Sequence, residues 1–207
     1  MKQIIQFLTG VTLALIISAC GAKQPNITID TGSSVPGTQV SKQGNSLMLL
    51  GKGIEVGHRL PTTALIDAST NKTIDLNNYK GTVLFLSIVP SINTKVCEAQ
   101  THLLGEEGDK MPSAIKRITI SRDTPLVQDN FAEEAKLTDL QYLSDYKDGE
   151  FGLSTGLLVD GPRVLARSVI LLDKQGIVQY IQVVPDITHL PDMERAFAKA
   201  IELNNMP

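Results

Sequence analysis

Two hydrophobic periods alternate along this chain, which predicts strands interspersed with helices. An apolar run from Val83 to Val89, which contains a single serine and is bounded by Gly81 and Pro90, is typical of a buried central strand. Further strands are predicted at 63–66, 115–120 and 141–143, with a late hairpin that joins 168–172 to 178–183. Another hairpin is expected near the amino end, where 47–50 and 54–56 flank Gly51-Lys-Gly53.

Helices are predicted where apolar residues recur every three or four positions. One such segment begins near Cys97, a second covers 125–136 with Pro125 in its first turn, and a third covers 191–203. The third segment places Met193, Ala196, Phe197, Ala200 and Ile201 on one face. Strands that alternate with helices and end in a hairpin indicate an α/β domain.

The first twenty residues have the pattern of an export signal. Lys2 precedes a mostly apolar stretch from Ile4 to Ile17, and Ser18-Ala19-Cys20 follows as a small-residue cleavage site. The cysteine at this point resembles a bacterial lipoprotein signal, which implies that residues 1–19 are removed and that Cys20 carries the lipid. An uncleaved membrane anchor is the alternative, but the stretch is slightly short and contains polar residues such as Gln6.

The composition changes twice after the signal. Residues 20–45 are rich in Gly, Ser, Thr, Gln and Pro and show no period, so they are predicted to form a lipidated N-terminus and a flexible tether. Residues 46–207 are long enough for one domain with a sizeable core. Several acyl chains on Cys20 would attach this domain durably to the extracytoplasmic side of a bacterial membrane, which is the periplasmic side in a Gram-negative cell.

Charge and residue spacing exclude several other classes of function. The 19 basic and 22 acidic residues give a net charge of −3 without a basic stripe, so nucleic-acid binding has no support. His58, His102 and His189 lie far apart and have no metal-ligand spacing. The glycines of 149–156 lack the spacing and the lysine of a phosphate loop. The sequence therefore implies no metal and no cofactor.

Cys97 is the main candidate for a reactive side chain. It is the only cysteine besides Cys20. Pro90 ends the central strand, and Asn93 or Thr94 is a candidate N-cap, so Cys97 is expected in or near the first turn of a helix. Unpaired N–H groups and the positive dipole end at that place stabilise a thiolate. Taken singly, the same residues also fit a small buried hydrophobe, a helix cap and a strand stop.

Three separated blocks together resemble the thiol peroxidase family of the peroxiredoxins. They are Pro90-Ser-Ile-Asn-Thr-Lys-Val-Cys97, Ser121-Arg-Asp-Thr-Pro125, and Asp160-Gly-Pro162 followed by Ala166-Arg-Ser-Val-Ile-Leu-Leu-Asp173. The resemblance runs from about residue 46 to the C-terminus and implies a thioredoxin-like α/β fold with a central mixed sheet. It implies four catalytic residues: Cys97 as nucleophile, Thr94 and Arg167 as donors, and Pro90 as a shield against water. Alone, Arg167 would be a solvated charge at a strand end.

The implied activity is thiol-dependent reduction of hydrogen peroxide and small organic hydroperoxides through a cysteine sulfenic acid. Most members of the family carry a resolving cysteine where this chain has Ala132. Oxidised Cys97 would therefore need an external thiol or a thioredoxin-like reductant. The resemblance also allows a homodimer.

Two other functions remain open on the same fold. A non-turnover redox sensor or interaction module would use oxidised Cys97 as a signal. A disulfide oxidoreductase is disfavoured, because it needs Cys-x-x-Cys and position 94 is Thr.

Overall fold

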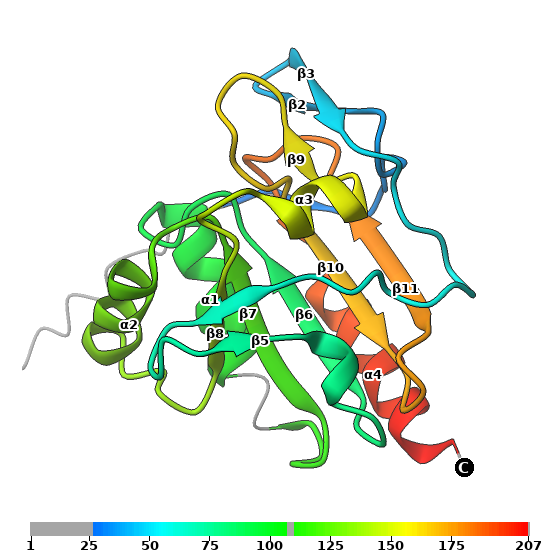
Figure 1. Ribbon diagram of the computed structural model, residues 1–207. Helices are drawn as coiled ribbons and strands as arrows, with labels where there is room; N and C mark the ends of the chain where they lie inside the picture. Colours follow the sequence, from blue (N-terminus) through cyan, green and yellow to red (C-terminus); the bar gives the residue numbers. More distant parts are fainter. Residues whose placement is uncertain (1–26, 107–109, 207) are drawn as a thin grey trace, which may run out of the picture.

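A seven-stranded mixed sheet forms the centre of the protein, whose computed structural model describes residues 27–106 and 110–206 (Figure 1). The strand order is β11-β10-β6-β7-β8-β4-β5. The pairs β6–β7 and β7–β8 are parallel, and the other pairs are antiparallel. The strands are β4 (Leu65–Asp67), β5 (Thr73–Ile74), β6 (Leu84–Ile88), β7 (Lys116–Ser121), β8 (Gln141–Ser144), β10 (Ser168–Leu172) and β11 (Val178–Val183).

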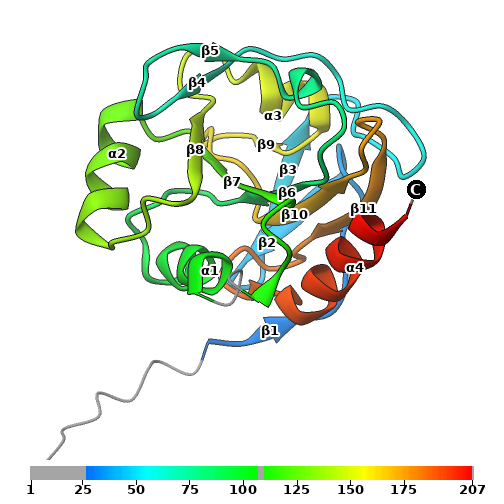
Figure 2. The ribbon, with the colours of Figure 1, turned by 90° about the horizontal axis from the view of Figure 1, so that it is seen from below.

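Both faces of this sheet are covered, because alternate residues of the central strand point to opposite sides. Leu84, Leu86 and Ile88 pack into one apolar cluster and Phe85 into the other. The Phe85 face is covered by α1 (Lys95–Glu106), α2 (Pro125–Glu134) and α4 (Met193–Asn205). The opposite face carries α3 (Glu150–Thr155) and a three-stranded sheet of β2 (Gln39–Lys42), β3 (Asn45–Leu50) and β9 (Leu158–Val159) (Figure 2). A short 3₁₀ helix, η1 (Leu76–Asn78), precedes β6.

Most elements of the central sheet agree with the prediction. The hairpin of 168–172 and 178–183 is confirmed as β10 and β11, with Ser168 opposite Val183. The apolar run that ends at Val89 contains β6, and the predicted strands at 63–66, 115–120 and 141–143 correspond to β4, β7 and β8. The helices predicted at 125–136 and 191–203 are confirmed as α2 and α4, with small shifts at their ends. The thioredoxin-like α/β class is therefore correct.

The hairpin predicted around Gly51-Lys-Gly53 is wrong. Strand β3 pairs instead with β2, and the turn between them is Gln43-Gly44. Both residues have positive φ, 52° and 82°, as a two-residue type I′ turn requires. Gly51 lies where the chain passes close to the backbone of Leu153 rather than in a hairpin turn. A Cβ at this position would lie 1.8 Å from the Leu153 carbonyl oxygen.

The flexible tether predicted through residue 45 is also wrong from residue 28 onward. Strand β1 (Ile29–Asp30) pairs in parallel with β12 (Leu190–Pro191), and β2 lies within residues assigned to the tether. These residues lack a hydrophobic period because backbone and side-chain hydrogen bonds, rather than an apolar face, hold most of them. The predicted signal of 1–19 and the lipidation residue Cys20 lie outside the described residues. Within the described part, no helix is long and apolar enough to cross a membrane.

Candidate active site

The turn after β6 brings Cys97 to the end of the central sheet. The Val89 N–H still donates to the Ile120 carbonyl at 2.9 Å, and half-buried Pro90 then leads the chain away from the sheet. Helix α1 begins directly after Thr94, whose carbonyl accepts the N–H of Glu98 at 2.8 Å. Thr94 is therefore the N-cap, and Cys97 is the third helical residue, as predicted. The N–H groups of residues 95–97 precede this first intrahelical bond, so they have no acceptor within the helix.

Two donors converge on the Cys97 sulfur. The Thr94 hydroxyl oxygen lies 2.9 Å from Sγ, and Nη2 of Arg167 lies 3.3 Å from it. Cys97 is fully buried, whereas Thr94 is exposed. The sulfur is thus shielded on most sides, and Thr94 marks the side nearest to solvent.

Arg167 is held rigidly although it carries a charge into the interior. It is only 2 % exposed. Its Nη1 donates to Oε1 of Gln100 at 2.8 Å, and its Nε donates to the Ile187 carbonyl at 2.9 Å. With the bond to sulfur, these contacts use three of the five guanidinium N–H groups, so two remain for a ligand. Among the described residues no carboxylate forms an ion pair with Arg167.

Gln100 completes this network, and the sequence interpretation missed it. Its side chain is fully buried, and its Nε2 donates to the Ser87 hydroxyl of β6 at 2.8 Å. Gln100 lies three positions after Cys97, so both residues share one face of α1. The signal that could have identified it is a polar residue between two apolar positions of one helix face, Cys97 and Leu104.

Asp123 is a second residue that the sequence interpretation left without a role. Its carboxylate accepts the Ser91 hydroxyl at 2.9 Å and the Ile92 N–H at 2.7 Å. It also accepts the Ser121 hydroxyl at 2.7 Å. Asp123 therefore fastens the turn that carries Thr94 to the end of β7.

The residue at the expected resolving position lies on the same side of the sheet as the sulfur. Ala132 of α2 is buried and belongs to the same apolar cluster as Cys97. Cys97 is the free cysteine in the described part of the chain. The described side chains therefore offer this sulfur no internal thiol.

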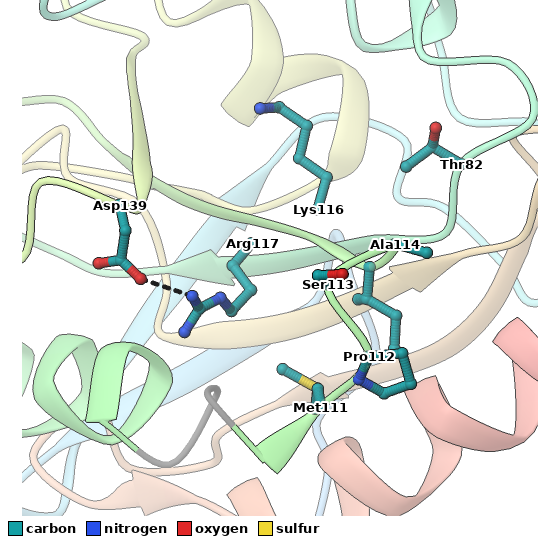
Figure 3. A pocket seen from close by; sticks show the side chains of 9 residues that line it. Thr82, Met111, Pro112, Ser113, Ala114, Lys116, Arg117 and Asp139 are labelled. Atoms are coloured by element: carbon teal, nitrogen blue, oxygen red, sulfur yellow. Dashed lines mark hydrogen bonds and ion pairs between the residues drawn. The ribbon is translucent and has the colours of Figure 1, made fainter.

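A sizeable cavity lies away from the Cys97 sulfur. It has a volume of about 490 Å³ and is lined by Thr82, Asp139 and the segment from Met111 to Arg117 (Figure 3). This segment enters β7 at Lys116, opposite Leu84, whereas the turn with Cys97 follows the other end of β6 at Ile88. An ion pair of 2.6 Å between Arg117 and Asp139 crosses the cavity wall. The cavity is not part of the sulfur site.

The histidines take no part in the sulfur site. His58, His102 and His189 lie near Glu55, Glu106 and Asp30 respectively. Within residues 27–106 and 110–206, no group of three or more His, Cys, Asp or Glu side chains could hold a metal ion.

Comparisons of the chain with a family model and with known proteins agree on one family. The Redoxin family model matches residues 55–197. A thiol peroxidase of Staphylococcus epidermidis is 36 % identical over 159 residues, which cover 77 % of this chain and 95 % of that protein. A thiol peroxidase of Bacillus subtilis is 33 % identical over 162 residues, which cover 78 % of this chain and 96 % of that protein.

Solved structures agree on the fold. A peroxiredoxin-like protein from Aquifex aeolicus superposes with a TM-score of 0.76 at 28 % identity, covering 82 % of this chain and 99 % of the other. A thiol peroxidase from Chromobacterium violaceum superposes with a TM-score of 0.68 at 19 % identity, covering 81 % and 98 %. The second likeness concerns the fold alone.

Proposed function

Because the chain belongs to the thiol peroxidase family of the redoxins and is a thiol-dependent peroxidase, we propose that Cys97 is its peroxide-reactive nucleophile. One observation supports this assignment above the others: the donors of Thr94 and Arg167, which are far apart in the chain, meet at one buried sulfur. A structural cysteine has no need of two such donors.

The proposed step moves one oxygen atom to sulfur. The Cys97 thiolate attacks one oxygen of the peroxide, and an S–O bond forms while the O–O bond breaks. The electron pair of the O–O bond leaves with the other oxygen, which takes a proton and departs as water or an alcohol. Cys97 is oxidised to the sulfenic acid, and the peroxide is reduced.

Fixed donors are expected to account for most of the acceleration. A lower thiol pKa increases the thiolate fraction but also lowers its nucleophilicity, so the net gain from ionisation is small. Thr94 and the two unused N–H groups of Arg167 would instead stabilise charge that develops on the peroxide oxygens. The N–H groups of Val96 and Cys97 would complete this cradle, and Pro90 would limit access of water.

An external thiol is proposed to complete the cycle, because Ala132 occupies the expected resolving position. A first thiol attacks the sulfenic sulfur and releases water, which leaves a mixed disulfide. A second thiol then attacks this disulfide and restores Cys97. Small thiols and thioredoxin-like proteins are both suitable by this chemistry, and hydrogen peroxide and small organic hydroperoxides are the proposed substrates.

We also propose lipid attachment at Cys20, which would place the enzyme on the extracytoplasmic side of a bacterial membrane. The described domain begins earlier than the tether prediction assumed, so only residues 21–28 separate Cys20 from β1. These residues span at most about 28 Å when fully extended. Labelling cells with a radioactive fatty acid tests this: the parent protein should be labelled and a Cys20→Ser variant should not. Assembly as a homodimer is a further proposal from family resemblance.

Peroxide turnover with supplied thiols tests the enzymatic function. The purified protein should consume hydrogen peroxide over many cycles with at least one of dithiothreitol, glutathione or a thioredoxin system. Cys97→Ser should abolish this consumption, whereas Cys20→Ser should retain it and serves as the matched control. Wild-type consumption by Cys97→Ser would contradict the assignment. A single oxidation without turnover under every reductant would favour the redox-sensor alternative.

A further inference from the structure

Residues 28–34 form a strap along the end of β11 and along β12. The Leu190 N–H donates to the Thr28 carbonyl at 2.8 Å, and β1 pairs with β12 directly after it. Figure 2 shows β1 on the side of the molecule that carries α1 and α4. The strap precedes residue 55, where the match to the Redoxin family begins.

A buried glutamine side chain donates two hydrogen bonds to this strap. Gln182 is 2 % exposed, and its Nε2 donates to the carbonyls of Asp30 and Gly32 at 2.7 and 3.0 Å. Its Oε1 accepts the N–H of Asp192 at 2.9 Å. Without the strap both amide hydrogens of this interior side chain would lose their partners, which is costly for a buried group. The strap is therefore an integral part of the fold.

The strap connects to Arg167 through the adjacent backbone. Val183 is bonded to it in both directions, since its N–H donates to the Ser33 hydroxyl at 3.0 Å and its carbonyl accepts the Ser34 N–H at 2.8 Å. The next N–H, that of Val184, donates to the Arg167 carbonyl at 2.9 Å. The Ile187 carbonyl then accepts Nε of the same arginine. The strap thus secures Gln182 and Val183, and through them the start of the segment that continues to Ile187, whose own N–H is bonded to Ser41 of β2.

We propose that this strap is a positioning element for Arg167, acting through Gln182–Val184 and the Ile187 carbonyl to fix the guanidinium beside the Cys97 sulfur. The inference rests on the proposed function of Arg167. A guanidinium that is misplaced by about 1 Å loses much of its effect on a transition state. Loosening the strap should therefore act on Cys97 only while Arg167 is present.

A double-mutant cycle on the full chain tests this coupling. Gln182→Met keeps the length of the side chain and removes both donors to the strap. We expect it to lower the second-order rate with hydrogen peroxide roughly tenfold. It should also move the midpoint of the pH profile for Cys97 alkylation by iodoacetamide to higher pH. Neither change should appear when Gln182→Met is added to Arg167→Gln.

Two further variants complete the design. Ser46→Ala removes an exposed 3.0 Å bond to Gln39 in the β2–β3 hairpin, away from the strap, and should leave both measurements unchanged. Ser33→Ala removes the bond to the Val183 N–H and the exposed bond to the neighbouring Ser34 carbonyl, but it leaves the Gln182 contacts in place. It should change both measurements in the same direction as Gln182→Met, by a smaller factor. If Gln182→Met does not fold, the Ser33→Ala measurements test the positioning role instead.

The outcomes are distinct. Equal losses in the parent and in the Arg167→Gln background, or no loss in either, would overturn the positioning role. A protein that reduces no peroxide but shows the predicted shifts in alkylation would refute the proposed function and leave the positioning role intact.

Discussion

Replacement of Arg167 by lysine should separate the charge of this residue from its geometry. The guanidinium reaches Sγ at 3.3 Å, Gln100 at 2.8 Å and the Ile187 carbonyl at 2.9 Å from three different nitrogens. A lysine ammonium has one nitrogen and no planar fork, so it cannot occupy these three positions together. Positive charge would remain near the sulfur, but its alignment with a peroxide would be lost.

The expected cost follows from the number of donors that are lost. Removal of one preorganised donor from a transition-state site typically lowers the rate about 10² to 10³-fold, or roughly 3 to 4 kcal/mol. Arg167→Lys should fall near the lower end of this range, and Arg167→Gln, which also loses the charge, near the upper end. The buried acceptors that lose Arg167 add a cost in stability, which thermal unfolding measures separately.

Stopped-flow kinetics with hydrogen peroxide, under conditions of a single oxidation, gives these rates directly. Arg195→Lys is the matched control, because Arg195 is exposed and lies over the ring of Tyr180 rather than near the sulfur. Rates of both Arg167 variants within twofold of the parent would refute the reasoning and show Arg167 to be structural.

Three further predictions address the surroundings of the site. Asp123→Asn should slow oxidation of Cys97 about tenfold in stopped-flow, since the amide supplies only one acceptor where the carboxylate binds Ser91, Ile92 and Ser121; an unchanged rate would show that the turn needs no such anchor. Ala132→Cys should form an intramolecular disulfide and lose two hydrogens in intact-mass spectra after oxidation; sulfenic and sulfinic products alone would place the resolving position elsewhere. Partial burial acts to raise the pKa of Asp186, but hydrogen bonds from Thr188 and Ser41 outweigh it and hold the pKa below its usual value. A carboxylate whose pKa is lower in the folded than in the unfolded protein stabilises the fold at pH values above its unfolded-state pKa. Asp186→Asn should therefore reduce the free energy of unfolding, measured with urea at pH 7, and this difference from the parent should shrink as the pH falls below about 3.9. A difference that stays constant with pH would contradict this prediction.

The sequence predicted best those features that depend on local pattern. The hairpin of β10 and β11 follows from two apolar runs around a short turn, and the first turn of α1 follows from Pro90 and Thr94. The roles proposed for Thr94 and Arg167 came from family resemblance, and the structure brings both residues to the sulfur. Spacing can relate Thr94 to Cys97, three positions later, but it could not have joined Arg167 to a residue 70 positions earlier in the chain.

The failures concern segments and side chains that no local sequence pattern marks. The pairing of β1 with β12 joins segments near opposite ends of the described chain, and no hydrophobic period marks it. The turn at Gln43-Gly44 lacks the usual Asn or Asp at its first position. Gln100 escaped notice because its function depends on Arg167, which the fold alone brings within 2.8 Å.

The mass of the protein after one equivalent of hydrogen peroxide tests the central claim most directly. Cys20→Ser leaves Cys97 as the only thiol, and the same variant with Cys97→Ser controls for oxidation of the five methionines. The account predicts one added oxygen on the first protein within seconds, a mixed disulfide when a thiol is present, and a second oxygen with excess peroxide. An unchanged mass, or the same gain in the variant without Cys97, would contradict the assignment of Cys97 as the nucleophile.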